Sequence, residues 1–488
     1  MPQRTRHYWN AIISASYKNA FFSETLNIYK KMCSHGFKPE SFNMVFAIKA
    51  CVRVSLLSCG KTLHSSAVKL NLERDSYVVP AIINMYVRFH CLDEARRVFD
   101  KMCERNWVSW GAMIRGYVKV NRAHEAFDLY FEMKRLGFEL DPFVAVGLVQ
   151  ACGLIFSLKE GKATHGYGLR RQVIFYSDIY FETSLLNMYL KCGSLDCSTR
   201  TFEGMNRKDL VSWSAMVSGL VQNGRASEAI DFFSRMLLEK IQPNLLTLSS
   251  VLSAFSQLGS LKHGKSIHGY LFRFGLEPDA IFYTCLIDTY TKCGALDLGR
   301  RIFDSMPQRS VFSWSAMISG YGTHGLGSGA LELFKSMLEE GLNPEPSTLV
   351  SVLSACSHSG LVDKGWEIFN SMEEKFGIRP VEDHYACMVD MLGRAGLIEE
   401  SELFISEMPI EPGGSVWGAL MGACKIHKNV ELAERVAEKL FVLEPDRPDA
   451  YVMLSNVYAS MGLWEGAERV REMMRERGLK KSHGFSSV

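Results

Sequence analysis

Apolar residues recur along the chain at the three- and four-residue spacing of amphipathic helices, and polar or glycine-rich segments separate these stretches. Before Gly341, for example, Leu331, Phe334 and Leu338 occupy positions i, i+3 and i+7, which a helix places on one face. Gly341 is expected to end this helix, and Pro344 marks the turn that follows. Because no alternating apolar–polar stretch of strand length occurs, the pattern predicts an all-α protein.

The pattern repeats with a nearly constant period. A tryptophan recurs at Trp9, Trp110, Trp213, Trp314 and Trp417, at intervals of 101 and 103 residues. Two further markers recur at intervals of 101 to 103 residues: Gly60, Gly161, Gly264 and Gly365, and then Met85, Met188, Thr289 and Met391. Three unrelated markers that share one period indicate an internally repeated architecture.

Each period divides into three repeats, of 35 residues, of 35 to 37 residues and of 31 or 32 residues. The first repeats are expected at 6–40, 107–141, 210–244 and 311–345, the second at 41–75, 142–178, 245–279 and 346–381, and the third at 76–106, 179–209, 280–310 and 382–413. Each repeat is predicted to form two helices. Two short helices cannot bury their apolar faces alone, so the twelve repeats predict a stacked α-solenoid with the aromatic and Met residues mostly in its core.

The repeat 311–345 shows the expected helices. The segment 314–321 predicts the first helix, a glycine-rich turn is expected at 322–327, and the second helix begins at 329. The turn contains part of a G-x-G-x-x-G match at 320–325. A dinucleotide site would need a strand before these glycines, so no nucleotide site is expected here.

Several segments resemble the pentatricopeptide repeat family, in particular its plant PLS subclass. The motifs are V-S-W-S-A-M at 211–216, N-M-Y-L-K-C-G at 187–193, L-S-A-C-S-H-S-G-L-V at 353–362 and H-Y-A-C-M-V-D at 384–390. The alternating repeat lengths are typical of this subclass, whereas tetratricopeptide repeats keep a uniform period of about 34 residues. The resemblance covers nearly the whole chain and implies a right-handed α-solenoid superhelix of two-helix repeats.

The pattern changes after the twelfth repeat, which ends at 413. Residues 414–447 and 448–481 resemble the two E-type repeats of this subclass, through S-V-W-G-A-L-M-G-A-C and Y-V-M-L-S-N-V-Y-A-S. Relatives usually continue K-K-x-P-G-x-S-W, whereas His483 and Ser487 stand here in place of Pro and Trp, within a tail at 482–488.

Many relatives end in a DYW deaminase domain, whose zinc chemistry needs H-x-E and P-C-x-x-C. Neither motif occurs in this chain, so no deaminase domain, and no enzyme activity of its own, is expected. The 13 cysteines form no C-x-x-C pair and are expected to be small buried groups in a reducing compartment. We therefore expect no catalytic residue, no metal and no cofactor. His64, His165 and His268 recur with the repeats and are expected to serve the scaffold.

The resemblance implies that each repeat binds one base of single-stranded RNA through its fifth and last residues, while an apolar second residue wedges between bases. Val211 and Phe312 would be such wedges. The most informative pairs are Thr183 with Asp209, Ser214 with Asn244 and Thr284 with Ser310. The poorer candidates are Asn10 with Glu40, Gly111 with Asp141, Pro80 with Asn106 and Ser315 with Glu345. Each polar member could instead serve as a helix N-cap.

Hydrogen-bond chemistry then predicts base preferences. Asp only accepts hydrogen bonds, whereas the Asn amide also donates. Guanine offers two donors on its Watson–Crick edge, so Asp209 suits guanine, and the acceptor at adenine N1 suits Asn244. We therefore expect G and then A on adjacent bases, 5′ to 3′, at the repeats 179–209 and 210–244. The repeat 280–310 is expected to prefer a purine weakly, with A favoured.

Charge and length restrict the partners. With 55 Lys and Arg against 53 Asp and Glu, the net charge of +2 argues against coating nucleic acid by bulk charge, although a local stripe can still bind it. No apolar stretch reaches the length of a membrane span. We expect a monomer.

The leading hypothesis is an organellar, sequence-specific RNA-binding protein, implied by the resemblance to be a specificity factor for C-to-U editing. A deaminase would then act in trans, docked on the E-type repeats. The alternatives are a splicing, stability or translation factor for an organellar transcript, and a protein-binding helical scaffold. Family frequency favours the mitochondrion over the chloroplast. No transit peptide is visible in the five residues, 1–5, before the first repeat.

Overall fold

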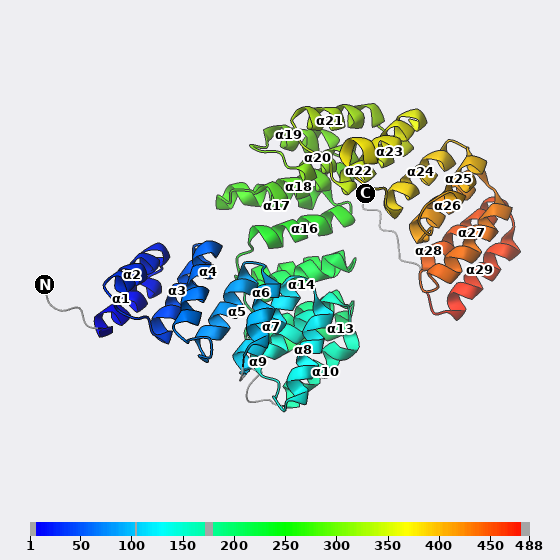
Figure 1. Ribbon diagram of the computed structural model, residues 1–488. Helices are drawn as coiled ribbons and strands as arrows, with labels where there is room; N and C mark the ends of the chain where they lie inside the picture. The colour runs from blue at the N-terminus through cyan, green and yellow to red at the C-terminus, as the bar shows by residue number, and fades with distance from the viewer. Residues whose placement is uncertain (1–5, 103–104, 171–178, 480–488) are drawn as a thin grey trace. The chain divides into compact units, whose positions relative to one another are not determined.

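The computed structural model describes residues 6–102, 105–170 and 179–479 of the 488-residue chain. Within these ranges every regular element is a helix and none is a strand (Figure 1), which confirms the predicted all-α class. The chain forms two compact bodies, an N-terminal body (Met1–Asn223) and a C-terminal body (Gly224–Val488). His483, Ser487 and the tails 1–5 and 482–488 lie outside the described residues.

The N-terminal body consists of stacked helix pairs. The first helices are α1 (Arg6–Lys18), α3 (Ser41–Arg53), α5 (Val78–Arg88), α7 (Trp107–Lys119), α9 (Pro142–Leu154), α12 (Ile179–Lys191) and α14 (Leu210–Gln222). The second helices are α2 (Phe22–Ser34), α4 (Leu57–Lys69), α6 (Leu92–Asp100), α8 (Ala123–Arg135), α10 (Leu158–Arg170) and α13 (Leu195–Gly204). From α1 to α12, each first helix packs on its own second helix and on the first helix of the next pair, so α3, α5 and α7 lie side by side (Figure 1).

The C-terminal body continues in the same way. Its second helices are α15 (Ala226–Leu238), α17 (Leu261–Phe274), α19 (Leu296–Ser305), α21 (Gly327–Glu339), α23 (Val362–Phe376), α25 (Ile398–Ser406), α27 (Val430–Leu443) and α29 (Trp464–Glu476). Its first helices are α16 (Leu245–Gln257), α18 (Ala280–Lys292), α20 (Val311–Thr323), α22 (Pro346–Ser359), α24 (Glu382–Arg394), α26 (Gly414–His427) and α28 (Pro448–Ser460). Stacked α-helical pairs in each body are the architecture that the periodicity predicts.

The two periodic markers Gly and Met contact one another. A Cβ added to Gly60 would lie 2.5 Å from Met85 Sδ, and one added to Gly161 would lie 2.5 Å from Met188 Sδ. The glycine of a second helix therefore leaves room for the methionine of the next first helix. Thr289 replaces the methionine beside Gly264, and an added Cβ there would lie 3.1 Å from Thr289 Cγ2.

Buried tryptophans join neighbouring pairs. Trp110 and Trp213 are fully buried, and each meets a phenylalanine of the preceding second helix edge to face. The ring centroids are 4.8 Å apart for Phe99 and Trp110 and 4.7 Å apart for Phe202 and Trp213. Trp417, in the first E-type repeat, is only half-buried, and its Nε1 donates to the Pro412 carbonyl at 3.2 Å.

The histidines that recur with the repeats hold second helices to first helices. His64, His165 and His268 each hydrogen-bond through Nδ1 to a tyrosine hydroxyl of the next first helix, at 2.9, 2.8 and 2.9 Å. The tyrosines are Tyr86, Tyr189 and Tyr290. Burial lowers the pKa of all three imidazoles, because the interior disfavours the charged form.

The helix limits in the repeat 311–345 differ from the predicted ones. Helix α20 extends beyond 314–321 to Val311–Thr323, and α21 already begins at Gly327. The prediction assigned the glycines to a turn, whereas Gly320 and Gly322 lie inside α20 and pack closely on Thr291 and Ala355. The glycine-rich motif at 320–325 is therefore mostly helical.

No helix in the described ranges has the length and apolar character needed to cross a membrane. Over the same part of the chain, no group of three or more His, Cys, Asp or Glu residues is arranged to hold a metal ion. The cysteines described there are free thiols.

Candidate RNA-binding interface

Large apolar side chains are exposed at the second residue of most repeats. Val211 and Phe312, the two wedges expected from the sequence, are 60% and 59% exposed. Other exposed second residues are Phe42, Tyr77, Val108, Tyr180, Leu246 and Ile281. Within each body these side chains recur at the same place, the first turn of a first helix, which makes them candidates for a contact surface. The sequence signal for the additional members is the apolar residue that directly follows the first residue in most of the repeats.

In several repeats the polar last residue caps the helix that follows it. Asp141 Oδ1 accepts from Val144 N at 2.8 Å, and Asp209 Oδ1 accepts from Ser212 N at 2.9 Å. In the C-terminal body, Asn244 Oδ1 accepts from the backbone N–H of Thr247 at 2.9 Å and from its hydroxyl at 2.8 Å. The N-cap interpretation that the sequence left open is therefore correct for these residues.

Capping occupies only one of the two polar atoms of such a side chain. Within the described ranges, Asp209 Oδ2 and Asn244 Nδ2 have no hydrogen-bond partner. The cap thus fixes the orientation of each side chain and leaves an acceptor on Asp209 and a donor on Asn244. A cap and a base contact are compatible at these two positions.

Other last residues make different contacts. Asn106 uses both atoms, because Oδ1 accepts from Ser109 N at 2.9 Å and Nδ2 donates to the Ser76 carbonyl at 3.1 Å. Ser310 Oγ accepts from Ser313 N at 3.3 Å. Glu40 forms an ion pair with Arg6 at 2.6 Å, which holds its carboxylate at the start of the same repeat.

The hydroxyls at the fifth residue bond to their own helices. Ser214, which is buried, donates to the Leu210 carbonyl at 2.6 Å, and Thr284 donates to the Ala280 carbonyl at 2.8 Å. Thr183, half-buried, makes no side-chain hydrogen bond within the described residues. Since a hydroxyl keeps its lone pairs while it donates, Thr284 still offers an acceptor.

The fifth residues of the poorer candidate pairs differ in what they can offer to a base. Ser315 is linked to Glu345, because its hydroxyl lies 2.8 Å from Thr348 Oγ1, which accepts from Glu345 N at 3.2 Å. Gly111 is buried and offers no side chain, and Asn10 Oδ1 is buried without a partner in the described ranges. Ser214 belongs to the N-terminal body and Asn244 to the C-terminal body.

A groove of about 400 Å³ in the N-terminal body is lined by residues at all three candidate positions of a repeat, the second, the fifth and the last. It is lined by the fifth and last residues of one repeat, Pro80 and Asn106, and by the successive second residues Tyr77 and Val108. A volume of this order accommodates a small planar ligand between two apolar walls. This pair looked uninformative in the sequence because Pro80 cannot hydrogen-bond, yet the structure places it in a groove of the expected type.

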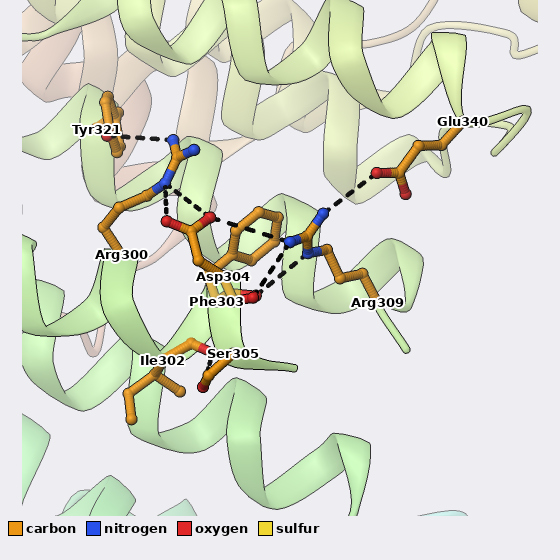
Figure 2. Close-up of polar contacts among 8 residues, drawn as sticks. All are labelled: Arg300, Ile302, Phe303, Asp304, Ser305, Arg309, Tyr321 and Glu340. Carbon is orange, nitrogen blue, oxygen red and sulfur yellow. Dashed lines mark hydrogen bonds and ion pairs between the residues drawn. The ribbon is translucent and has the colours of Figure 1, made fainter. Parts of the chain in front are cut away.

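Cations position the residues that cap the helices. Figure 2 shows the Arg309 guanidinium between the Phe303 ring, 4.8 Å away, and the Glu340 carboxylate, at 3.2 Å. Arg309 also lies 5.7 Å from the Trp314 ring and donates to the Phe303 carbonyl at 3.2 Å. Because Ser310 directly follows Arg309, these contacts fix the chain at the start of α20.

The same arrangement recurs in the N-terminal body. Arg105, directly before Asn106, lies 4.7 Å from the Phe99 ring and pairs with Glu132 at 2.7 Å. Lys208, directly before Asp209, lies 5.5 Å from the Phe202 ring. The third repeat of each of these periods therefore ends in a cation that packs on an aromatic ring and then in the candidate base-contacting residue.

Comparison with protein families gives matches through most of the chain. Residues 208–257 match the description "PPR repeat family", and residues 427–488 match "E motif". The description "PPR repeat" matches residues 8–37, 81–107, 108–138, 281–311, 312–342, 347–375 and 383–411.

Two relatives from Arabidopsis thaliana match the full chain. The pentatricopeptide repeat-containing protein At1g06140, mitochondrial, is 45% identical over 488 residues, which cover 100% of this chain and 87% of the relative. The pentatricopeptide repeat-containing protein At1g11290, chloroplastic, is 39% identical over 492 residues, which cover 100% of this chain and 60% of the relative. The chain is thus shorter than both relatives.

Solved structures share the fold. The pentatricopeptide repeat protein PPR10 from maize has a TM-score of 0.51 at 18% identity, covering 96% of this chain and 73% of PPR10. PPR10 in complex with an 18-nt psaJ RNA element has a TM-score of 0.52 at 15% identity, covering 98% of this chain and 86% of PPR10. The repeats, the E motif and the Arabidopsis relatives together show that the chain belongs to the plant pentatricopeptide repeat family.

Proposed function

We propose that this protein binds single-stranded RNA of an organelle in a sequence-specific way. The observation that carries the proposal is the alternation of exposed apolar second residues with polar last residues, whose free atom is oriented by a helix cap. Bases that stack against the apolar residues would present their Watson–Crick edges to the polar atoms. The fold shared with PPR10, which is solved in complex with an RNA element, supports this proposal.

The free atoms give the sequence preference. Asp209 Oδ2 accepts from the donors of guanine, and Asn244 Nδ2 donates to adenine N1. Thr183 and Ser214 would supply the hydroxyls at the fifth residues, and Val211 would separate the two bases. The preferred dinucleotide is therefore G followed directly by A, and the repeat 280–310 adds a weaker purine preference.

A selection experiment tests the base preference. The purified protein is titrated against a randomised single-stranded RNA pool of about 20 nucleotides, which is longer than the twelve bases expected at one base per repeat, and the bound species are sequenced. Enrichment of G-A at a fixed position is the expected result. Binding without enrichment contradicts the sequence preference, and no binding favours a protein-binding scaffold, which exposed apolar residues would also suit.

We propose further that the protein specifies C-to-U editing sites, with a deaminase acting in trans on the E-type repeats 414–481. Exposed apolar side chains there, Val442 at 81% and Trp464 at 66%, support a protein contact in this region. Loss of the protein in the plant should abolish editing at a cytidine near a G-A-containing site. Unchanged editing together with an altered level or splicing of the bound transcript would instead assign the alternative RNA role.

We also propose that the protein acts in an organelle, with the mitochondrion favoured over the chloroplast. The support is the terms mitochondrial and chloroplastic in the names of its relatives. Imaging the full-length gene product fused to a fluorescent protein distinguishes the two. Light scattering of the purified chain tests the expected monomer.

A further inference from the structure

A cavity of about 320 Å³ lies in the N-terminal body between α10 and the helix pair α12 and α13. Phe181 and Leu185 of α12 and Leu169 of α10 give it apolar walls. Phe181 and Leu185 are buried, whereas Leu169 is exposed at the rim. Apolar walls with a few polar groups, around a volume of this order, are typical of sites for small molecules.

The cavity is separate from the candidate RNA-binding interface. None of the residues that line it is the second, the fifth or the last residue of a repeat. Most of its lining comes from the second helices α10 and α13 and from the part of α12 that faces them. A molecule bound here would therefore not occupy the positions at which a base is expected.

Small residues account for the open space. Among the lining residues are Gly168, Cys197 and Thr201. At the equivalent positions one period later, the chain has the larger residues Leu271, Leu298 and Ile302. Leu271 is buried there, and Ile302 packs against the core of the C-terminal body. Unfilled space between helices costs packing energy, because the groups around it lose their contact partners, and a bound molecule would restore these contacts.

The charged groups of the cavity balance. Arg200 and Glu182, which have opposite charges, both line it. Among the residues that the structure describes, none forms a hydrogen bond or an ion pair with the Arg200 guanidinium, whereas Glu182 already takes part in another interaction. Burial lowers the pKa of His165, so this third polar group is uncharged at neutral pH.

These groups favour an uncharged ligand with a hydrogen-bond acceptor. A charged ligand would bring an unpaired charge against apolar walls, which is costly. Arg200 offers N–H donors and no acceptor, so it suits a carbonyl oxygen. His165 is already held through Nδ1 by the Tyr189 hydroxyl at 2.8 Å, which fixes the imidazole in the wall of the cavity.

We infer that the cavity between α10, α12 and α13 is a binding site for a small uncharged aromatic molecule of one or two rings that carries a carbonyl group. Phe181, Leu185 and Leu169 would contact the rings, and Arg200 would donate to the carbonyl. The inference is independent of the proposed RNA binding. Because such a ligand binds only the folded N-terminal body, it would also stabilise that body.

Calorimetric titration of the full chain with three probes of one shape tests the ligand class. The probes are 2-naphthamide, which is uncharged, 2-naphthoate, an anion, and 2-naphthylmethylammonium, a cation. One equivalent of 2-naphthamide should bind and raise Tm, and both charged probes should bind about tenfold more weakly or less. Tighter binding of either charged probe, or no stoichiometric binding of 2-naphthamide, would overturn the inference.

Filling the cavity tests its location. A variant with both Cys197→Leu and Thr201→Ile carries the residues of the equivalent repeat and should lose binding of 2-naphthamide without a fall in Tm. Unchanged affinity in this variant, with circular dichroism like that of the unmodified protein, would place the probe elsewhere and overturn the site. If the double variant misfolds, Cys197→Leu alone is measured, and the same outcomes apply.

The arginine provides a matched pair of substitutions. Arg200→Gln should weaken 2-naphthamide by about tenfold, because a hydrogen bond to a charged donor is lost. Arg301→Gln removes the cation at the equivalent position of α19, which does not line the cavity, and should leave the affinity unchanged. Equal effects of the two substitutions would contradict the contact between Arg200 and the carbonyl group.

Discussion

At the scale of single residues, the last residue of a repeat has a structural role that is compatible with the proposed binding role. Asp209 and Asn244 each cap a helix with one oxygen and keep a second polar atom that differs in hydrogen-bond character. The cap holds the side chain in one orientation, so the entropy lost on base binding is reduced. Exchange between Asp and Asn should therefore change the base preference without changing the helix.

Asn244→Asp tests this directly. The carboxylate caps α16 as well as the amide does, but it replaces the donor Nδ2 by an acceptor, so the preferred base should change from A to G. Competition between two RNAs that differ only at this base measures the change, which we expect to be about tenfold or more. Asn244→Ser is the control, since serine caps the helix and should merely reduce discrimination. An unchanged ratio for Asn244→Asp would contradict the assignment of one base to each repeat.

Arg309 offers a second test at this scale. Arg309→Ala removes contacts with Phe303, Trp314 and Glu340, of which the carboxylate is well exposed and contributes little. We expect a loss of about 1–2 kcal/mol, seen as a fall in Tm of about 2–6 °C by circular dichroism. Arg309→Lys should lose less, because Lys208 already occupies the equivalent position over Phe202. A Tm unchanged in Arg309→Ala would show that the ring contacts do not hold the chain before Ser310.

Sequence alone could not decide between a helix cap and a base contact. Asp, Asn and Ser are preferred at both kinds of position, and the choice depends on which atoms remain without a partner. Asn106 and Asn244 are the same residue type at the same repeat position, yet Asn106 uses both polar atoms and Asn244 keeps its Nδ2. The candidate positions follow from the repeat register, whereas their availability follows only from the hydrogen bonds.

At the scale of helices, close packing of glycine against methionine sets the distance between a second helix and the next first helix. The sequence supplies these glycines and methionines as two separate markers with the same period. Only the structure shows that Gly161 and Met188 contact each other, and that the change from Met to Thr289 relieves the contact at Gly264.

The two glycines provide a matched pair of substitutions. Gly161→Ala places a methyl group against buried Met188 and should destabilise the N-terminal body by about 1–2 kcal/mol, because the overpacking exceeds the gain in helix propensity. Gly264→Ala meets Thr289 at 3.1 Å and should be nearly neutral, since the propensity gain offsets the contact. Thermal unfolding followed by circular dichroism measures both. Equal shifts in Tm would show that the methionine does not limit this packing.

The apolar periodicity predicted that these segments are helical, but it did not predict the residues at which the helices begin and end. The predicted limits around 314–321 failed because glycine is common both in turns and at close helix contacts, and Gly320 and Gly322 belong to the second kind. The start of α20 depends on the Ser310 cap, which a hydrophobic pattern does not reveal.

At the scale of the whole molecule, composition describes an average that hides the distribution of charge. The net charge of +2 is compatible with a local cluster of cations, Lys49, Arg53, Arg88, Arg115 and Lys119, because acids elsewhere compensate for it. Alignment of the repeats on their ninth and thirteenth residues would have revealed this cluster from the sequence. The two grooves beside this cluster, of about 400 and 460 Å³, could be recognised only in the folded structure, because residues from three successive repeats line each of them.

The three buried histidines of the scaffold predict how the stability of the molecule depends on pH. Burial lowers the pKa of His64, His165 and His268 in the folded state, so between that value and about 6.5 the unfolded chain binds more protons. The stability that these histidines contribute should therefore be fully present above about pH 6.5 and should decrease as the pH falls below this value. Tm measured from pH 8 down to pH 5.5 should fall, and replacement of all three histidines by Gln should reduce this dependence, while His384, whose pKa is also lowered by burial, keeps part of it. His124→Gln, an exposed control, should leave it unchanged, and a triple variant with the original pH dependence would place the responsible groups elsewhere.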